Sequence, residues 1–135
     1  MNNGSVNHIG IATHSLDESE SIWQTLGFSP IKDEIMTEQG VKIRYLKGEG
    51  ETKIELLEPL SDNSPIGKFL SKQGPGIQQI AINISDLDSK ISELKSLGVQ
   101  MINNEPIKGS SGKRIAFIHP SSCGGVLIEL VESSL

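Results

Sequence analysis

Apolar and polar residues alternate along two short stretches of the chain, residues 6–12 and 77–84. This period of two predicts half-buried strands. After each stretch a serine, Ser15 or Ser85, precedes acidic residues, which predicts the start of a helix. Apolar residues then recur at helical spacing, and Gly27 and Gly98 stand where the two helices are expected to end. These apolar positions are Leu16, Ile22, Trp23 and Leu26 in the first helix and Leu87, Ile91, Leu94 and Leu97 in the second.

Three short strands are expected after each predicted helix. They lie near residues 28–35, 41–47 and 52–58 in the first half and near 99–105, 114–118 and 125–131 in the second half. Turn-forming residues at 48–50 and 121–125 separate the last two strands of each half. A short helix near Pro65–Lys72 is expected in the segment between the halves.

The two halves are related in sequence. Residues 8–28 align without gaps on residues 79–99, and seven of the 21 pairs are identical. The segments 43–46 and 53–58 similarly resemble 115–118 and 127–132. Internal repetition of this kind indicates two copies of one structural module. Trp23 aligns with Leu94, so these two side chains are expected at equivalent core positions.

The pattern therefore predicts one α+β domain over residues 1–135, built from two tandem βαβββ modules. Module one covers residues 6–59, a linker covers 60–76, and module two covers 77–132. A pseudo-twofold axis is expected to relate the modules, with a curved mixed sheet enclosing a cavity.

The repeat also pairs polar residues on the predicted strands. His8 aligns with Gln79 on the first strand of each module, and Glu55 corresponds to Glu129 on the last strand. Each glutamate stands between apolar neighbours, so it faces the side opposite to them. One imidazole, one amide oxygen and two carboxylates are a plausible ligand set for a divalent transition metal. The alternative is that these strand faces point to solvent and carry no ligand.

Other residues with chemical potential have simpler interpretations. His119 ends a predicted strand, and Lys113 follows a glycine-containing loop, so either could contact a substrate or serve the structure alone. His14 is interpreted as a loop residue. Cys123 lies in a glycine-rich turn without a neighbouring partner, which argues against a catalytic thiol.

Composition narrows the possible functions. The chain has 135 residues and a formal net charge of −5, which argues against nucleic-acid binding. No apolar run approaches the ~20 residues of a membrane span, and the N-terminal residues do not resemble a secretory signal. A single cysteine excludes an intrachain disulfide and fits a reducing compartment, so a cytoplasmic location is expected.

Several motifs carry a family resemblance. They are residues 6–12 (VNHIGIA), 38–41 (EQGV), 54–60 (IELLEPL), 63–66 (NSPI) with Phe69-Leu70, and His119-Pro120 followed by residues 123–130 (CGGVLIEL). In these segments the chain resembles the vicinal oxygen chelate superfamily, which includes glyoxalase I, extradiol dioxygenases and resistance proteins. It is most similar to the methylmalonyl-CoA epimerases of that superfamily, over nearly its whole length.

The resemblance implies a glyoxalase-like fold and a metal-dependent epimerase acting on methylmalonyl-CoA or a similar 2-substituted malonyl thioester. The reaction would proceed by proton abstraction at C2 through a metal-stabilised enolate. The implied metal ligands are His8, Gln79 and Glu129, and the repeat adds Glu55 as the counterpart of Glu129. Glu129 and Glu55 are also the expected catalytic acid/base groups. Gln78, Lys113 and His119 are the expected substrate-binding residues. The expected partners are an acyl-CoA substrate and a second copy of the chain, with no nucleic acid and no membrane.

Two departures from the family pattern affect these expectations. The epimerases usually read Gly-x-His-His-Ile where this chain reads residues 76–80 as Gly-Ile-Gln-Gln-Ile. The expected ion is cobalt, nickel or zinc, and its binding is weakened or absent if Gln79 fails to replace the imidazole. Some epimerases also carry a catalytic glutamate on the strand where this chain has Val41-Lys42-Ile43. Two alternatives therefore stay open, a lyase of the glyoxalase I type (lactoylglutathione lyase) and a metal-free small-molecule-binding module.

Overall fold

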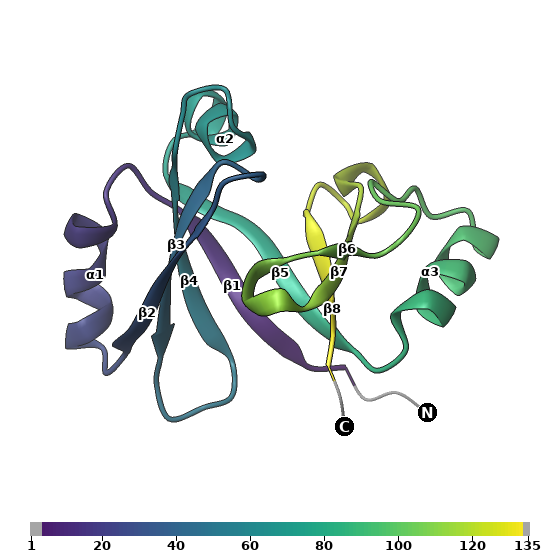
Figure 1. The fold of residues 1–135 in the computed structure, drawn as a ribbon, viewed down its shortest axis with the longest axis horizontal. Coiled ribbons are helices and arrows are strands. Elements are labelled where there is room, and N and C mark those ends of the chain that lie inside the picture. Colours follow the sequence, from purple (N-terminus) through teal and green to yellow (C-terminus); the bar gives the residue numbers. More distant parts are fainter. Residues whose placement is uncertain (1–3, 134–135) are drawn as a thin grey trace. The chain divides into compact units, whose positions relative to one another are not determined.

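A computed structural model describes residues 4–133 and divides into two units (Figure 1). The N-terminal unit is His8–Gln78, and the C-terminal unit combines the described residues up to Asn7 with those from Gln79 onward. These boundaries fall inside two strands, Val6–Ala12 and Gly76–Ile84, and most of the first lies in the N-terminal unit and most of the second in the C-terminal unit. Elements follow one another along the chain in the predicted order, a strand, a helix and three strands, twice. The prediction of an α+β fold with two βαβββ modules is confirmed. The pseudo-twofold, the enclosed cavity and the assignment of one domain stay predictions.

The N-terminal unit is a four-stranded sheet with one helix against each face. Its elements are β1 (Val6–Ala12), α1 (Leu16–Thr25), β2 (Ser29–Met36), β3 (Val41–Lys47), β4 (Lys53–Pro59) and α2 (Pro65–Gln73). The strand order is β2-β3-β4-β1, in which β1 runs parallel to β4 and the other pairs are antiparallel. The side chains of β4 show why the sheet forms, because Ile54 and Leu56 pack toward α1 while Leu57 packs toward α2.

The C-terminal unit repeats this topology. Its elements are β5 (Gly76–Ile84), α3 (Leu87–Ser96), β6 (Ile107–Lys108), β7 (Arg114–Ile118) and β8 (Ile128–Glu132), with short 3₁₀ turns at Ser110–Gly112 and Pro120–Ser122. The strand order is β5-β8-β7-β6, and β5 runs parallel to β8 as β1 does to β4. The sequence repeat therefore corresponds to a repeated structural unit.

One predicted strand is wrong. Residues 99–105 contain only an isolated bridge between Met101 and Ile118, and the strand forms later, at Ile107–Lys108. The reason is a side-chain hydrogen bond. Asn103 Oδ1 accepts the backbone N–H of Phe117 at 2.9 Å, so this N–H of β7 bonds to a side chain and not to the backbone of a neighbouring strand. The start of the second helix is also corrected, because Asp86 and not Ser85 accepts the capping N–H of Ser89.

The helices α1 and α3 bury fewer apolar side chains than the helical spacing in the sequence predicts. Leu16 of α1 is buried, as are Leu87 and Ile91 of α3, whereas Ile22, Leu26 and Leu97 are exposed. Trp23 and Leu94 are partly buried and pack against the core of their own unit, as the alignment predicts. An amphipathic helix lying on a sheet buries one stripe only, so apolar residues beside that stripe stay at the surface.

A glycine fixes the approach of α2 to the turn before it. A Cβ added to Gly67 would lie 2.4 Å from the carbonyl oxygen of Ser61 and 2.7 Å from that of Asp62. These are backbone atoms, so they cannot move aside as a flexible side chain would. We expect Gly67→Ala to lower the free energy of unfolding by about 1–3 kcal/mol in urea denaturation. The control is Gly50→Ala, because nothing lies within 4 Å of a Cβ at that position; equal losses in both variants would contradict this account.

The face of the N-terminal sheet that packs against α1 carries a charged cluster centred on Arg44. Its guanidinium contacts Asp33 at 2.8 Å and Asp17 at 2.8 Å. The hydrogen bond from Arg44 holds the pKa of Asp33 below its ordinary value of 3.8. A carboxyl whose pKa is depressed by folding stabilises the protein above its unfolded pKa and loses that effect as the pH falls through the folded value.

We therefore expect the melting temperature of the wild type to fall below about pH 4 partly through protonation of Asp33. Asp33→Asn should melt lower than the wild type at pH 7, and the difference should shrink on acidification. Asp62→Asn is the control, because Asp62 forms no ion pair among the described residues. A difference between Asp33→Asn and the wild type that does not change with pH would contradict the assignment.

Candidate active site

Four polar residues are buried on strands of the two units. The exposed fractions are 2% for His8, 4% for Glu55, 9% for Gln79 and 4% for Glu129. The alternative that these strand faces point to solvent is therefore wrong. Buried carboxylates are costly unless a partner compensates their charge, so each needs a neighbour that donates or a cation that binds it.

In the N-terminal unit, His8 and Glu55 form a pair. The parallel register of β1 and β4 places Glu55 opposite Gly10, two residues beyond His8 on the same face. His8 Nδ1 lies 3.0 Å from Glu55 Oε2. A carboxylate at Nδ1 orients the imidazole and leaves Nε2 on the opposite edge of the ring, which is the arrangement found behind many metal-binding histidines.

The C-terminal unit contains the corresponding pair, Gln79 and Glu129. The register of β5 and β8 places Glu129 opposite Ala81, again two residues beyond the first member of the pair. Gln79 Nε2 donates to Glu129 Oε1 at 2.6 Å. The amide nitrogen thus faces the carboxylate, and the amide oxygen is the atom through which Gln79 could bind a metal ion.

The two pairs have the same architecture: a donor on the first strand and a glutamate on the last strand, joined across a parallel register. Each pair lies within one unit. The meeting of the four side chains at a single ion stays a prediction.

An aromatic side chain lies across the sheet from each glutamate. Tyr45 is the cross-strand partner of Glu55, and Phe117 is the partner of Glu129. The Tyr45 hydroxyl donates to Glu34 Oε1 at 2.7 Å, which brings a second carboxylate to the sheet face that carries Glu55. Sequence reasoning did not identify Tyr45 or Glu34. The signal was available, because Tyr45 and Phe117 align in the repeat and alternate in phase with the buried positions of their strands.

The residues predicted to bind substrate have differing surroundings. Gln78 lies next to Gln79 on β5, so its side chain points to the opposite face, and its buried Oε1 has no hydrogen-bond partner among the described residues. Lys113 is exposed at the end of its loop. His119 Nδ1 accepts the backbone N–H of Ser121 at 3.0 Å, which caps the turn at Pro120–Ser122.

The surroundings of Cys123 agree with an unreactive thiol. Burial raises the pKa of this thiol above its ordinary value. The thiol is therefore protonated at neutral pH, and the thiolate is the nucleophilic form.

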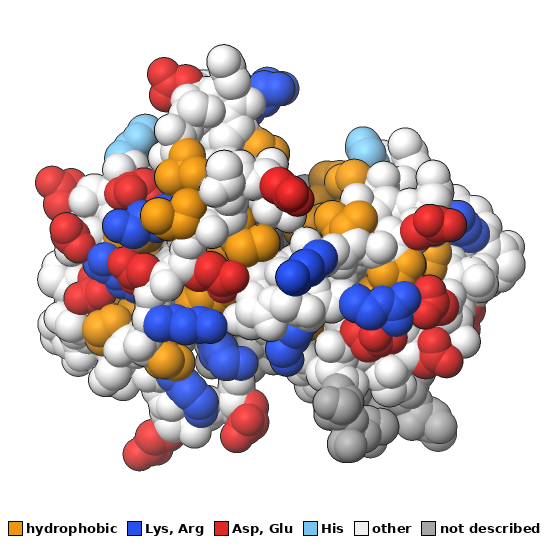
Figure 2. All heavy atoms as spheres, in the orientation of Figure 1, with side chains coloured by type: hydrophobic (Ala, Val, Ile, Leu, Met, Phe, Trp, Pro, Cys, Tyr) orange, Lys and Arg blue, Asp and Glu red, His pale blue; other side chains and the backbone are white. Residues whose placement is uncertain are grey.

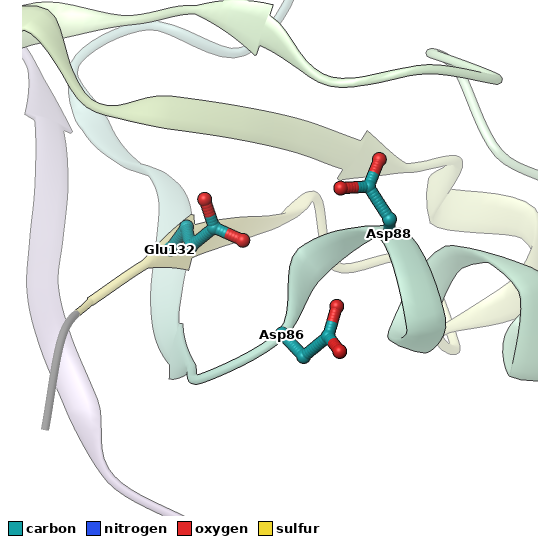
Figure 3. Close-up of side chains that lie close together, drawn as sticks. All are labelled: Asp86, Asp88 and Glu132. Carbon is teal, nitrogen blue, oxygen red and sulfur yellow. The ribbon is translucent and has the colours of Figure 1, made fainter.

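A cluster of acidic side chains at the start of α3 has a structural explanation. Figure 3 shows Asp86, Asp88 and Glu132 close together. Glu132 accepts the Leu87 N–H at 2.9 Å, and Arg114 contacts both Asp88 and Glu132. The N-terminal unit has the same arrangement at α1, where Glu58 accepts the Leu16 N–H and Arg44 contacts Asp17. Because both units have this arrangement, we interpret it as a structural contact that holds the first turn of the helix against the sheet.

The donor chemistry of the four buried residues fits a divalent metal ion. Imidazole, amide and carboxylate groups are all common ligands of such ions. His8 Nδ1 and Gln79 Nε2 face the glutamates, so His8 Nε2 and the Gln79 amide oxygen are the atoms of these two side chains that could bind the ion.

A family profile described as the Glyoxalase/Bleomycin resistance protein/Dioxygenase superfamily matches residues 7–117. The chain belongs to this superfamily. The predicted resemblance to the vicinal oxygen chelate proteins and the glyoxalase-like fold are thereby confirmed.

Individual relatives are known as epimerases. The chain is 34% identical to the ethylmalonyl-CoA/methylmalonyl-CoA epimerase of Cereibacter sphaeroides, over 96% of this chain and 98% of the relative. The crystal structure of methylmalonyl-CoA epimerase from Mycobacterium tuberculosis is 42% identical, covers 96% of this chain and 88% of its own, and has a TM-score of 0.90. A variant of the Streptomyces coelicolor methylmalonyl-CoA epimerase, in complex with 2-nitronate-propionyl-CoA, is 39% identical, covers 96% and 94%, and also has a TM-score of 0.90.

These likenesses confirm the predicted enzyme class, a racemase or epimerase. They also support a divalent metal ion, without indicating which one. Among residues 4–133, none of the helices has the length and apolar character needed to cross a membrane.

Proposed function

We propose that this protein is a metal-dependent epimerase of methylmalonyl-CoA or a closely similar 2-substituted malonyl thioester. The observation that carries the proposal is the buried donor–carboxylate pair at the same register in both units. The relatives known as methylmalonyl-CoA epimerases support the choice of substrate.

We assign four residues to the metal site: His8 through imidazole nitrogen, Gln79 through its amide oxygen, and Glu55 and Glu129 through carboxylate oxygens. Cobalt, nickel and zinc are the proposed ions. When bound, a divalent ion supplies positive charge to the thioester and carboxylate oxygens of the substrate, which acidifies C2.

The side chains of the chain then move the proton. Glu129 takes the C2 proton of one epimer onto a carboxylate oxygen, and the electron pair left at C2 delocalises onto the thioester oxygen. A proton delivered from the opposite face by Glu55 completes the inversion. Gln79 and His8 hold these carboxylates in position through the 2.6 Å and 3.0 Å contacts. The order of roles reverses for the other epimer.

Three further residues are proposed to contact the substrate. Gln78 offers a buried amide oxygen, Lys113 an exposed ammonium group and His119 an imidazole at the end of β7. A homodimer and a cytoplasmic location also remain proposals.

The test is conversion of a single epimer of methylmalonyl-CoA by purified protein supplied in turn with cobalt, nickel and zinc. We expect the mixture to approach equal amounts of the two epimers. The hemithioacetal of methylglyoxal and glutathione should not be consumed, because that turnover identifies a lyase of the glyoxalase I type. Binding of thioesters without either turnover would identify the metal-free binding module and contradict the proposal.

A further inference from the structure

Three lysines lie on the sheet face of the N-terminal unit that carries Glu55. Lys32 on β2 is the cross-strand partner of Tyr45, which is itself the partner of Glu55. Leu46 pairs with Ile54, so continuing the same antiparallel register places Lys47 opposite Lys53. Side chains alternate along a strand, and Lys47 is therefore on the face of Tyr45 and Lys53 on the face of Glu55.

The lysines are also close to the candidate active site along the strands. Lys53 is two residues before Glu55 on β4, a separation of about 7 Å between Cα atoms. It is also the register partner of His8 on β1. A flexible lysine side chain extends the reach of each ammonium group beyond its Cα position.

This arrangement costs stability. Like charges directly opposite each other on antiparallel strands repel. Lys47 Nζ donates to the carbonyl oxygen of Gly50 at 3.4 Å, and neither Lys47 nor Lys53 forms an ion pair among the described residues. Lys32 lies with its ammonium group 5.0 Å from the centre of the Tyr45 ring. An anion between Lys47 and Lys53 would relieve their repulsion.

The local charge also contrasts with the rest of the molecule. The chain has a net charge of −5, yet Figure 2 shows Lys and Arg side chains (blue) gathered over the lower part of the N-terminal unit, above the hairpin that joins β3 and β4. Glu49 and Glu51, both exposed, lie in that hairpin. They form no ion pair with Lys47 or Lys53.

We infer that Lys32, Lys47 and Lys53 form an anion-binding subsite for the phosphate groups of the coenzyme A part of the substrate. The subsite rests on the proposed function, because a thioester of coenzyme A carries its phosphates at the end of a flexible arm attached to the reacting acyl group. Ammonium groups bind phosphate oxygens through charge-assisted hydrogen bonds. The subsite would hold the coenzyme while the acyl group occupies the site at His8 and Glu55.

The first test measures binding of coenzyme A itself by calorimetry, with pantetheine, which lacks the phosphates, as the comparison ligand. We expect Lys47→Gln/Lys53→Gln to bind coenzyme A roughly tenfold more weakly than the wild type and pantetheine equally well. Added salt should weaken the wild type more than the variant, because salt screens charge interactions.

Two matched variants sharpen this test. Lys42→Gln removes the same charge from the opposite face of β3, where Lys42 lies 3.9 Å from Asp33, and should leave coenzyme A affinity unchanged. Glu49→Gln/Glu51→Gln removes negative charge beside the lysines and should tighten binding. Equal affinities of the wild type and Lys47→Gln/Lys53→Gln, or equal weakening by Lys42→Gln, would overturn the subsite.

Turnover separates this inference from the proposed function. If both are right, Lys47→Gln/Lys53→Gln raises KM for methylmalonyl-CoA but not for methylmalonyl-pantetheine. If the protein epimerises its substrate but the variant has the wild-type KM for methylmalonyl-CoA, the subsite is wrong and the proposed function remains supported. Lysine-dependent binding of coenzyme A without any epimerisation would overturn the proposed function and leave the subsite standing.

Discussion

Glu129→Gln is expected to lower the rate of epimerisation by about 10²–10⁴-fold, the usual contribution of a general acid or base. The substitution keeps the size of the side chain and an oxygen that can accept from Gln79 Nε2, now at 2.6 Å from Oε1. It removes the group that can accept the C2 proton. The measurement is the rate at which one epimer of methylmalonyl-CoA loses its chirality.

Two controls define what this loss means. Glu105→Gln changes an exposed glutamate of the same unit and should leave the rate unchanged. Thermal unfolding should show that Glu129→Gln is folded, since Glu129 is buried. A folded Glu129→Gln protein that epimerises at the wild-type rate would show that Glu129 is not the base.

Gln79→His is expected to raise the affinity for cobalt or zinc about tenfold or more, equivalent to ~1.4 kcal/mol of binding free energy or above. Imidazole is a stronger donor than an amide oxygen toward these ions. The substitution also restores the side chain that the related epimerases usually carry in their Gly-x-His-His-Ile motif. Calorimetric titration of the metal-free protein measures the change directly, without any need for turnover.

The neighbouring residue provides the control for this substitution. Gln78→His places the same imidazole on β5 but on the opposite face, so it should leave metal affinity unchanged. If Gln79→His binds cobalt and zinc as the wild type does, Gln79 is not a ligand. If Gln78→His raises the metal affinity as much as Gln79→His, the increase does not depend on the strand face. That result would also show that Gln79 is not specifically a ligand.

Much of the fold could be predicted because the chain repeats itself. Two aligned copies of strand, helix and glycine gave β1 and β5, α1 and α3, and the ends at Gly27 and Gly98, where φ is 100° and 84°. The short helix expected at Pro65–Lys72 is α2, ending one residue later. At these positions the local propensity and the alignment of the two copies predict the same elements, so the prediction is reliable there.

The errors fall where side-chain hydrogen bonds override the local pattern. Apolar and polar residues alternate over 99–105 as they do in a strand, but the Asn103 side chain accepts a backbone N–H of β7. Ser85 resembles an N-cap, yet Asp86 accepts the capping hydrogen bonds from Ser89. Such competition between side chain and backbone is decided by geometry that sequence spacing does not contain.

The candidate site was predictable in part for the same reason. Alternation placed His8 and Glu55 on one face of their strands, and the repeat pointed to Gln79 and Glu129. The register that puts each glutamate two residues beyond its partner needed the parallel pairing of β1 with β4 and of β5 with β8. The Tyr45–Glu34 hydrogen bond depends on a contact across β2 and β3 that only the folded sheet supplies.

The most direct test of the central claim is incubation of a single epimer of methylmalonyl-CoA in deuterated water, with the protein loaded with cobalt. Label at C2 and chirality are followed together. We predict that the protein incorporates deuterium at C2 while the epimers interconvert, because a proton leaves one face and another arrives at the opposite face. Retention of both hydrogen and chirality at C2, with cobalt, nickel and zinc each supplied, would contradict the account.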